Sequence, residues 1–386
     1  MNSSQLMNKN DQRSNEKRMN PTTGLIDDDW LLDRALGACV GACIGDASGA
    51  PLEKLRAGRP PTESEVAAAM TLLPSSLRTA SLVRPGGITD DGEMTVSLSN
   101  AFAEMAASET EPGFELEIVA KHYGRWVQTA PPDMGLTVGA SIGVARSTQK
   151  SFLDVIARQG LALQMQRGAA FEAKMAAPSK SNGQLMRTAP IAVFGHRLDD
   201  DALFELVKAD CSLSHIAPVC ADASMAYCVA LRELLRRPDA TGAEAFEAAR
   251  VWTEAHAGDE LKQWMAAVVA GAECPAWPNA GFVKVAWSIA LAHLKRFDSA
   301  APLSEHTYND VLRAVLLAGG DADTNACIAG ALIGALVGFN RLPAASKARV
   351  LGHKSQRPEF LHASTLLETV PEMLRRAPKK DYRSLT

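Results

Sequence analysis

Two apolar segments near opposite ends of the chain carry a glycine at every fourth position. The first set comprises Gly37, Gly41, Gly45 and Gly49, and the second comprises Gly330, Gly334 and Gly338. Residues four apart share one face of an α-helix, although glycine inside a helix costs roughly 1 kcal/mol relative to alanine. A face of glycines lets another backbone approach closely, so we expect the two helices to pack against each other in one core. Two separate close packings with no shared site are the alternative.

The second glycine repeat follows a turn that carries hard oxygen ligands. Glycine tolerates positive φ, so Gly319 and Gly320 allow the backbone to turn sharply. The oxygens of Asp321, Asp323 and Thr324 suit Mg²⁺, Mn²⁺ or Ca²⁺ rather than zinc. The apolar run behind them is shorter than the roughly 17–25 residues of a membrane span. We therefore expect a buried helix with the acids at its N-terminal end.

A similar arrangement precedes another predicted helix, where Gly86 and Gly87 are followed by Thr89, Asp90 and Asp91. Irregular backbone before a helix can aim side chains at a ligand, which suits metal binding. Together the two clusters offer six oxygen ligands, enough for two divalent cations about 3.5–4 Å apart, as in two-metal hydrolases.

Two further acids belong to the first glycine repeat. Asp46 lies within it and Glu53 follows its end. Their charges would repel the other carboxylates unless cations are bound or the groups lie far apart. If the repeats pack together, we expect these acids to reach the same site.

The rest of the sequence predicts a helical protein. The chain has 386 residues, 47% of them hydrophobic and 22% charged, as in ordinary globular proteins. Helical runs alternate with turns, one such run being predicted over residues 140–159, and alternating strand patterns are nearly absent. We expect an all-α fold with a single compact domain over residues 29–375, a disordered arm over 1–28 and a polar tail over 376–386. The arm is too poor in apolar residues to fold alone.

Charge and cysteine usage restrict the class of protein further. A net charge of −4 gives no basic footprint for nucleic acid, and the N-terminus lacks the apolar core of a signal peptide. Seven scattered cysteines without a Cys-x-x-Cys pair predict reduced, buried thiols. We expect a cytoplasmic protein with no nucleic-acid or membrane partner.

Three segments resemble the signature blocks of the ADP-ribosylglycohydrolases. These are GDASGAPLE at 45–53, TDDGEM at 89–94 and GGDADTNA at 319–326. They occur in the family's order, with weaker similarity at 126–137, at 181–187 and at Ser214-His215, so the resemblance covers about residues 32–343. One departure is Gly92, where the family usually has threonine, and we expect a looser turn there rather than loss of metal.

The resemblance implies a binuclear Mg²⁺ or Mn²⁺ site that cleaves the bond between ADP-ribose and a protein side chain, most often arginine. The implied metal ligands are Thr89, Asp90, Asp91, Asp321, Asp323 and Thr324. The implied catalytic residues are Glu53, Asp91 and Asp321, with Glu53 beside the scissile bond. The implied substrate contacts are Asn182, Gly183 and His215 in the cleft and Asp133 at its rim.

Several residues near this region leave two interpretations open. The backbone N–H groups of 181–183 suit a diphosphate cradle, but Asn-Gly also forms plain surface turns. His215 is either a ligand contact or a satisfied core histidine. Arg187 is either a phosphate contact or a member of a structural ion pair.

The function also has alternatives. The family includes immunity proteins against ADP-ribosylating toxins, so the chain could block a cognate ADP-ribosyltransferase through its N-terminal arm, with or without hydrolysis. A protein that only holds ADP-ribose as a sensor is a third hypothesis, which the complete set of six ligands argues against.

Overall fold

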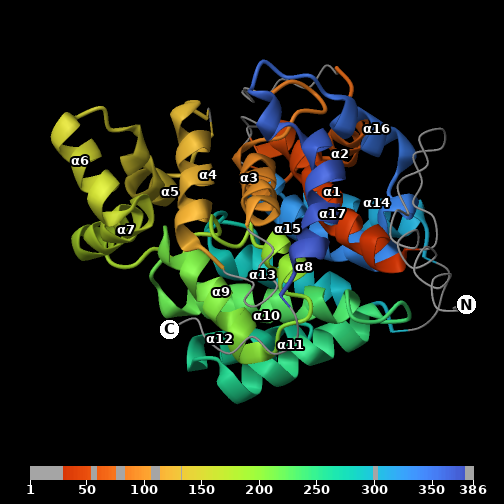
Figure 1. The fold of residues 1–386 in the computed structure, drawn as a ribbon. Coiled ribbons are helices and arrows are strands. Elements are labelled where there is room, and N and C mark those ends of the chain that lie inside the picture. Colours follow the sequence, from red (N-terminus) through yellow and green to blue (C-terminus); the bar gives the residue numbers. More distant parts are fainter. Residues whose placement is uncertain are drawn as a thin grey trace, which may run out of the picture.

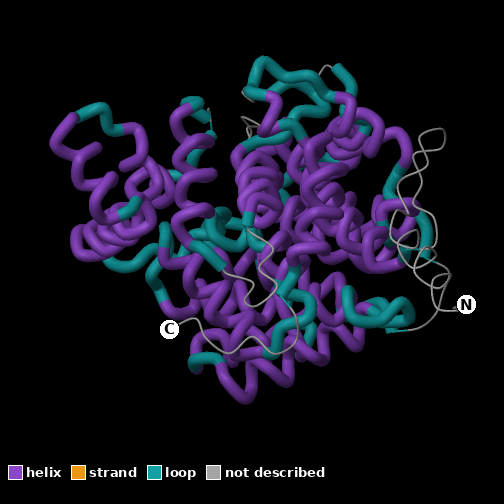
Figure 2. The backbone as a smooth tube through the Cα atoms, viewed as in Figure 1, coloured by secondary structure: helices purple, strands orange, loops and turns teal. Residues whose placement is uncertain are grey.

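The computed structural model describes most of the chain. The described residues are 29–53, 59–74, 83–105, 114–131, 133–298 and 303–378. The predicted arm over 1–28 lies outside them, as does most of the predicted tail. Within the described part the regular structure is helical, with one isolated bridge between Ser181 and Phe282 and no strand (Figure 2). This confirms the all-α prediction.

The centre of the fold is the pair formed by α1 (Trp30–Glu53) and α15 (Ala322–Val337) (Figure 1). Their glycine faces meet so closely that backbone touches backbone. A Cβ added at Gly334 would lie 2.1 Å from the carbonyl oxygen of Gly37, a distance at which no side chain fits. The same close approach to the partner helix's backbone is made by Gly37, Gly41, Gly45, Gly49 and Gly330, whereas Gly338 faces the Asp33 carboxylate of α1. The predicted close packing of the two helices is confirmed.

Further helices enclose this central pair. The helices packed directly on the pair are α2 (Glu63–Met70), α3 (Asp90–Glu104), α8 (Ala189–Phe194), α10 (Pro218–Leu234), α13 (Val283–Leu294), α14 (Glu305–Ala318), α16 (Ala344–Gly352) and α17 (Leu366–Arg376). An outer set, packed on these helices, comprises α4 (Leu116–Gln128), α9 (Asp200–Ser212), α11 (Gly242–His256) and α12 (Asp259–Val269).

A lobe of short helices stands out from this body beside α4 (Figure 1, yellow). It comprises α5 (Leu136–Ser141), the 3₁₀ turn η1 (Ile142–Arg146), α6 (Lys150–Gln159) and α7 (Leu161–Ala176). The predicted single helix over 140–159 is therefore wrong. Ser147 adopts an extended backbone between η1 and α6. Gly160, at φ 85°, separates α6 from α7.

Helix α1 is long and apolar enough to cross a membrane by length and composition alone, but 94% of its most apolar window is buried inside the protein. Its place against α15 makes it a buried helix of the core. All seven cysteines are free thiols, and only Cys274 is partly exposed.

Candidate active site

A cleft of about 470 Å³ lies where the N-terminal ends of α3 and α15 meet the C-terminal end of α1. Its wall is completed by the loop and helix over 133–138 and by the loop over 181–183. The lining residues are Glu53, Asp90, Asp91, Asp133, Met134, Gly135, Leu136, Thr137, Val138, Ser181, Asn182, Gly183, Met186, Gly281, Asp321, Asp323 and Thr324.

The glycine turn before α15 places the first group of acids. Gly319 and Gly320 both have positive φ, at 68° and 74°, as the sequence predicts. Asp321 then occupies the N-cap position of α15, and Asp323 lies in its first turn. Carboxylates at a helix N-terminus interact favourably with the helix dipole, and Asp321 also accepts a hydrogen bond of 2.7 Å from Asn182 Nδ2.

The start of α3 is held by an acid from α1. Asp46 accepts hydrogen bonds from Thr89 N at 2.9 Å, Thr89 Oγ1 at 2.7 Å and Gly92 N at 2.9 Å. A Cβ at Gly92 would lie 2.6 Å from Asp46 Oδ2 and 2.7 Å from Ile88 Cβ. The expected looser turn at Gly92 is therefore wrong, because glycine here permits a tighter contact with Asp46.

The carboxylates converge in two overlapping groups. Oxygens of Asp46, Asp91 and Asp323 lie within 4.8 Å of one another, and so do oxygens of Glu53, Asp133 and Asp323. Asp323 belongs to both groups. The packing of α1 on α15 thus brings acids from both glycine-repeat segments to one place, as expected from the sequence.

The convergence of these carboxyl groups disfavours their ionised forms. Burial, followed by the charge of neighbouring carboxylates, raises the pKa of Asp90, Asp91 and Asp323 well above the usual value for aspartate. Burial also raises the pKa of Asp46 to about 7, although its three hydrogen bonds oppose the shift. Oδ1 of Asp91 is buried and has no hydrogen-bond partner among the described residues. Clustered carboxylates with an oxygen lacking a donor fit a divalent cation.

The predicted metal ligands occupy two positions relative to the cleft. Asp90, Asp91, Asp321, Asp323 and Thr324 line it. Thr89 lies behind them, and the single proton of its hydroxyl is shared between Asp46 Oδ1 at 2.7 Å and Asp91 Oδ2 at 3.1 Å. Donation to carboxylates leaves the lone pairs of the Thr89 oxygen available for a cation.

Of the predicted catalytic and substrate-binding residues, some line the cleft and one lies behind its wall. Glu53, Asp133, Asn182 and Gly183 line the cleft. His215 does not: it is 2% exposed and lies behind Ser181, with Nε2 2.7 Å from the Ser181 oxygen.

Two of the three backbone N–H groups in the loop over 181–183 are engaged inside the protein and cannot serve a diphosphate cradle without exchanging partners. Asn182 N–H donates to the carbonyl of Gly281 at 3.0 Å, and Ser181 N–H donates to Ser179 Oγ at 3.3 Å. Arg187 is bonded away from the cleft, to Asp210. The phosphate-contact interpretation of Arg187 is therefore wrong, and the structural ion pair is what the fold contains.

Two residues of the cleft wall lie in the segment 126–137 that resembles the family, but the resemblance predicts no role for them. Leu136 lines the cleft yet is 93% exposed, and Thr137 stands beside it. The resemblance places Asp133 of the preceding turn at the rim of the cleft, and the fold shows that Leu136 and Thr137 continue the wall from there.

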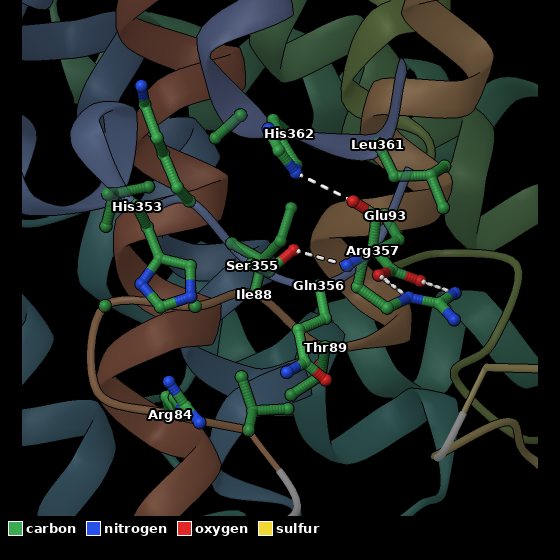
Figure 3. A pocket seen from close by; sticks show the side chains of 16 residues that line it. Arg84, Ile88, Thr89, Glu93, His353, Ser355, Gln356, Arg357, Leu361 and His362 are labelled. Carbon is green, nitrogen blue, oxygen red and sulfur yellow. Dashed lines mark hydrogen bonds and ion pairs between the residues drawn. The ribbon is translucent and has the colours of Figure 1, made fainter. Parts of the chain in front are cut away.

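A second pocket of about 220 Å³ lies behind Thr89, between residues 83–93 and 350–363 (Figure 3). In it Glu93 faces Arg357, accepting from Nε at 2.6 Å and Nη2 at 2.8 Å. Trp126 Nε1 donates to the same carboxylate at 2.9 Å. The first turn of α3 is thus anchored on both sides, by Asp46 and by Arg357.

Replacing Arg357 with glutamine should lower the free energy of unfolding by about 1–3 kcal/mol, because the buried Glu93 carboxylate loses its charged partner and keeps only Trp126. Urea unfolding measures the change. The exposed ion pair of Arg375 with Glu372 supplies the control, since Arg375→Gln should cost less than about 1 kcal/mol. Equal effects of the two variants would contradict the anchoring role.

Raising the pH should strengthen the stabilisation by Mg²⁺. Aspartates with a raised pKa stabilise the metal-free fold while they are protonated, and this contribution is lost as pH rises through the folded pKa, about 7 for Asp46. Cation binding needs the ionised forms. We expect the Mg²⁺-induced rise in melting temperature to be larger at pH 8 than at pH 6, with NaCl at equal ionic strength as control. A rise independent of pH would contradict the site.

Comparison with known proteins relates this geometry to a family. A sequence model described as ADP-ribosylglycohydrolase matches residues 27–379. The ADP-ribosyl-[dinitrogen reductase] glycohydrolase of Rhodospirillum rubrum is 25% identical over 317 residues, covering 81% of this chain and 88% of the relative. A solved structure titled ADP-ribosylglycohydrolase-related protein complex matches with a TM-score of 0.59 and 21% identity, over 90% of this chain and 99% of that one. The last likeness concerns the fold alone.

Proposed function

Because this chain belongs to the ADP-ribosylglycohydrolase family, we propose that it is a metal-dependent hydrolase that releases ADP-ribose from arginine side chains of a modified protein. Hydrolysis of ADP-ribosyl groups is the activity of the family; the arginine linkage and the cations are the proposal. The observation that supports it most is the convergence of the acids of α1, α3 and α15 on one cleft.

Two divalent cations, Mg²⁺ or Mn²⁺, fit the donor set. Asp90, Asp91, Asp321, Asp323 and Thr324 would hold them from the cleft wall, with the Thr89 oxygen behind. The buried Asp91 oxygen that lacks a hydrogen-bond donor supports this assignment. When bound, such cations supply Lewis-acid chemistry, orienting ribose hydroxyls and lowering the pKa of water.

The carboxylates in the cleft support an arginine linkage. Glu53 and Asp133 present carboxylates beside Asp323, and a guanidinium leaving group pairs well with carboxylates. Departure from a ribose anomeric carbon passes through an oxocarbenium-like state. Glu53 is placed to transfer a proton or to orient the attacking water. Asn182 holds Asp321 in position through its amide.

The substrate is proposed to be a protein. The relative from Rhodospirillum rubrum is named for dinitrogen reductase, and the cleft here reaches the protein surface at Leu136, which is 93% exposed. The free thiols are consistent with a cytoplasmic location.

The linkage can be tested with two modified proteins, one carrying ADP-ribose on arginine and one on serine. The proposal predicts release of ADP-ribose from the arginine-linked protein only. A control variant, Glu53→Gln, keeps the shape of the side chain and should slow release. Preferential cleavage of the serine linkage would contradict the assignment of arginine while leaving the family activity intact.

A further inference from the structure

A chain of hydrogen bonds runs from a buried ion pair to the cleft wall. Arg187 Nε pairs with Asp210 Oδ2 at 3.0 Å, and the two side chains are 0% and 3% exposed. Arg187 Nη2 donates to Ser214 Oγ at 2.9 Å. Ser214 Oγ is 2.9 Å from His215 Nδ1, and His215 Nε2 is 2.7 Å from Ser181 Oγ in the cleft wall.

The direction of each proton in this chain follows from what each group can do. A guanidinium only donates, so Ser214 Oγ accepts from Arg187. The Ser214 proton then needs an acceptor, and Nδ1 of His215 is the one in contact. If Nδ1–H donated instead, the Ser214 proton would be left unpaired in a residue that is 1% exposed, which costs about 1–3 kcal/mol. Nδ1 therefore accepts.

The imidazole holds one proton, which must then be on Nε2. Burial, together with the charge of Arg187, lowers the pKa of His215 to about 3, so the ring is neutral at physiological pH. Nε2–H donates to Ser181 Oγ. His215 is thus a buried core residue whose hydrogen bonds are satisfied, and it supports the cleft wall through its hydrogen bond to Ser181.

Ser181 also receives a hydrogen bond from its other side. Thr137 Oγ1 donates to Ser179 Oγ at 2.9 Å, and Ser179 Oγ donates to Ser181 Oγ at 3.3 Å. With His215 and Ser179 both donating to it, the Ser181 oxygen uses its acceptor capacity inside the protein, and its own proton remains for a group in the cleft.

We propose that Ser214 and the Arg187–Asp210 pair are positioning residues that fix His215 as the Nε2–H tautomer and thereby make the Ser181 hydroxyl a hydrogen-bond donor to an acceptor oxygen of the bound ligand. That the ligand is ADP-ribose rests on the proposed function; the tautomer does not. Because the backbone N–H groups of Ser181 and Asn182 are already engaged, the side chain of Ser181 takes over part of the role that the sequence suggested for them.

The tautomer can be measured directly by NMR of the full chain labelled with ¹⁵N-histidine. Two-bond ¹H–¹⁵N correlations distinguish the tautomers, and His215→Gln identifies the signals among the eight histidines. We expect neutral Nε2–H at pH 7 in the wild-type protein and a reduced Nε2–H population in Ser214→Ala. Nδ1–H at His215 in the wild-type protein would overturn the inference.

A double-mutant cycle on ADP-ribose affinity, measured by calorimetry, tests the consequence. Ser181→Ala should weaken binding about tenfold, as loss of one hydrogen bond does. Ser214→Ala should also weaken it, and the double variant should bind like Ser181→Ala alone, because Ser214 acts through Ser181. Fully additive effects would overturn the relay.

The matched control for the cycle is Ser224→Ala, a buried serine on α10 whose hydroxyl has no partner among the described residues; it should leave the affinity unchanged. If the wild-type protein does not bind ADP-ribose, the proposed function fails, and the NMR result still decides the tautomer.

Discussion

Replacing Gly334 with leucine is expected to lower the free energy of unfolding by at least about 3 kcal/mol, at the upper end of overpacking effects. A Cβ at this position would lie 2.1 Å from the carbonyl oxygen of Gly37 and 3.2 Å from Gly41 Cα. Those atoms belong to backbone, which cannot rotate away as a side chain can. The two central helices would have to separate. Chemical unfolding followed by far-UV circular dichroism gives the magnitude.

The matched control is Gly352→Leu at the end of α16, where a Cβ would meet nothing within 4 Å. We expect its stability to change by less than about 0.5 kcal/mol, the usual range for surface substitutions. If Gly334→Leu were as stable as Gly352→Leu, close packing of α1 on α15 would be refuted.

Replacing Asp321 with alanine is expected to reduce release of ADP-ribose to the background rate and to remove at least one bound cation. Asp321 stands at the N-cap of α15, lines the cleft and is held by Asn182. A bound cation stabilises the fold by about 2.7 kcal/mol at a hundred times its dissociation constant. The variant should therefore lose stability in buffer with Mg²⁺ much more than in buffer with chelator.

Asp199→Ala provides the comparison for this result. Asp199 caps α9 by accepting from Ala202 N at 2.9 Å and does not line the cleft, so its loss should cost a similar amount with and without Mg²⁺. An Asp321→Ala protein that binds as many cations as the wild type would contradict the assignment of Asp321 as a ligand.

The central pair of helices could be predicted because its signals are local. A glycine at every fourth position is best explained by a close contact between helices. The glycine pair before Asp321 is best explained by a turn with positive φ. These two signals sufficed to predict that acids from both ends of the chain meet. The family resemblance then predicted metal-binding and catalytic roles for these acids.

The parts that were missed depend on contacts between segments remote in sequence. In the sequence, Asp46 is only one more negative charge near the predicted metal ligands. In the fold it accepts hydrogen bonds from the backbone of Thr89 and Gly92 and so fixes the start of α3. The role of Arg187 was undecidable until the fold placed Asp210 against it. The break between η1 and α6 depends on the backbone at Ser147, where helix propensity gives only a weak signal.

The central proposal is that the acids of α3 and α15 hold two cations and that, with Glu53 of α1, this site hydrolyses an ADP-ribosyl linkage. The direct test strips the purified protein with chelator, titrates Mg²⁺ or Mn²⁺ back, and follows release of ADP-ribose from an arginine-modified protein alongside cation stoichiometry. We predict no release from the stripped protein and full recovery with two cations per chain. Undiminished release in excess chelator, or full activity with a single cation, would contradict the account.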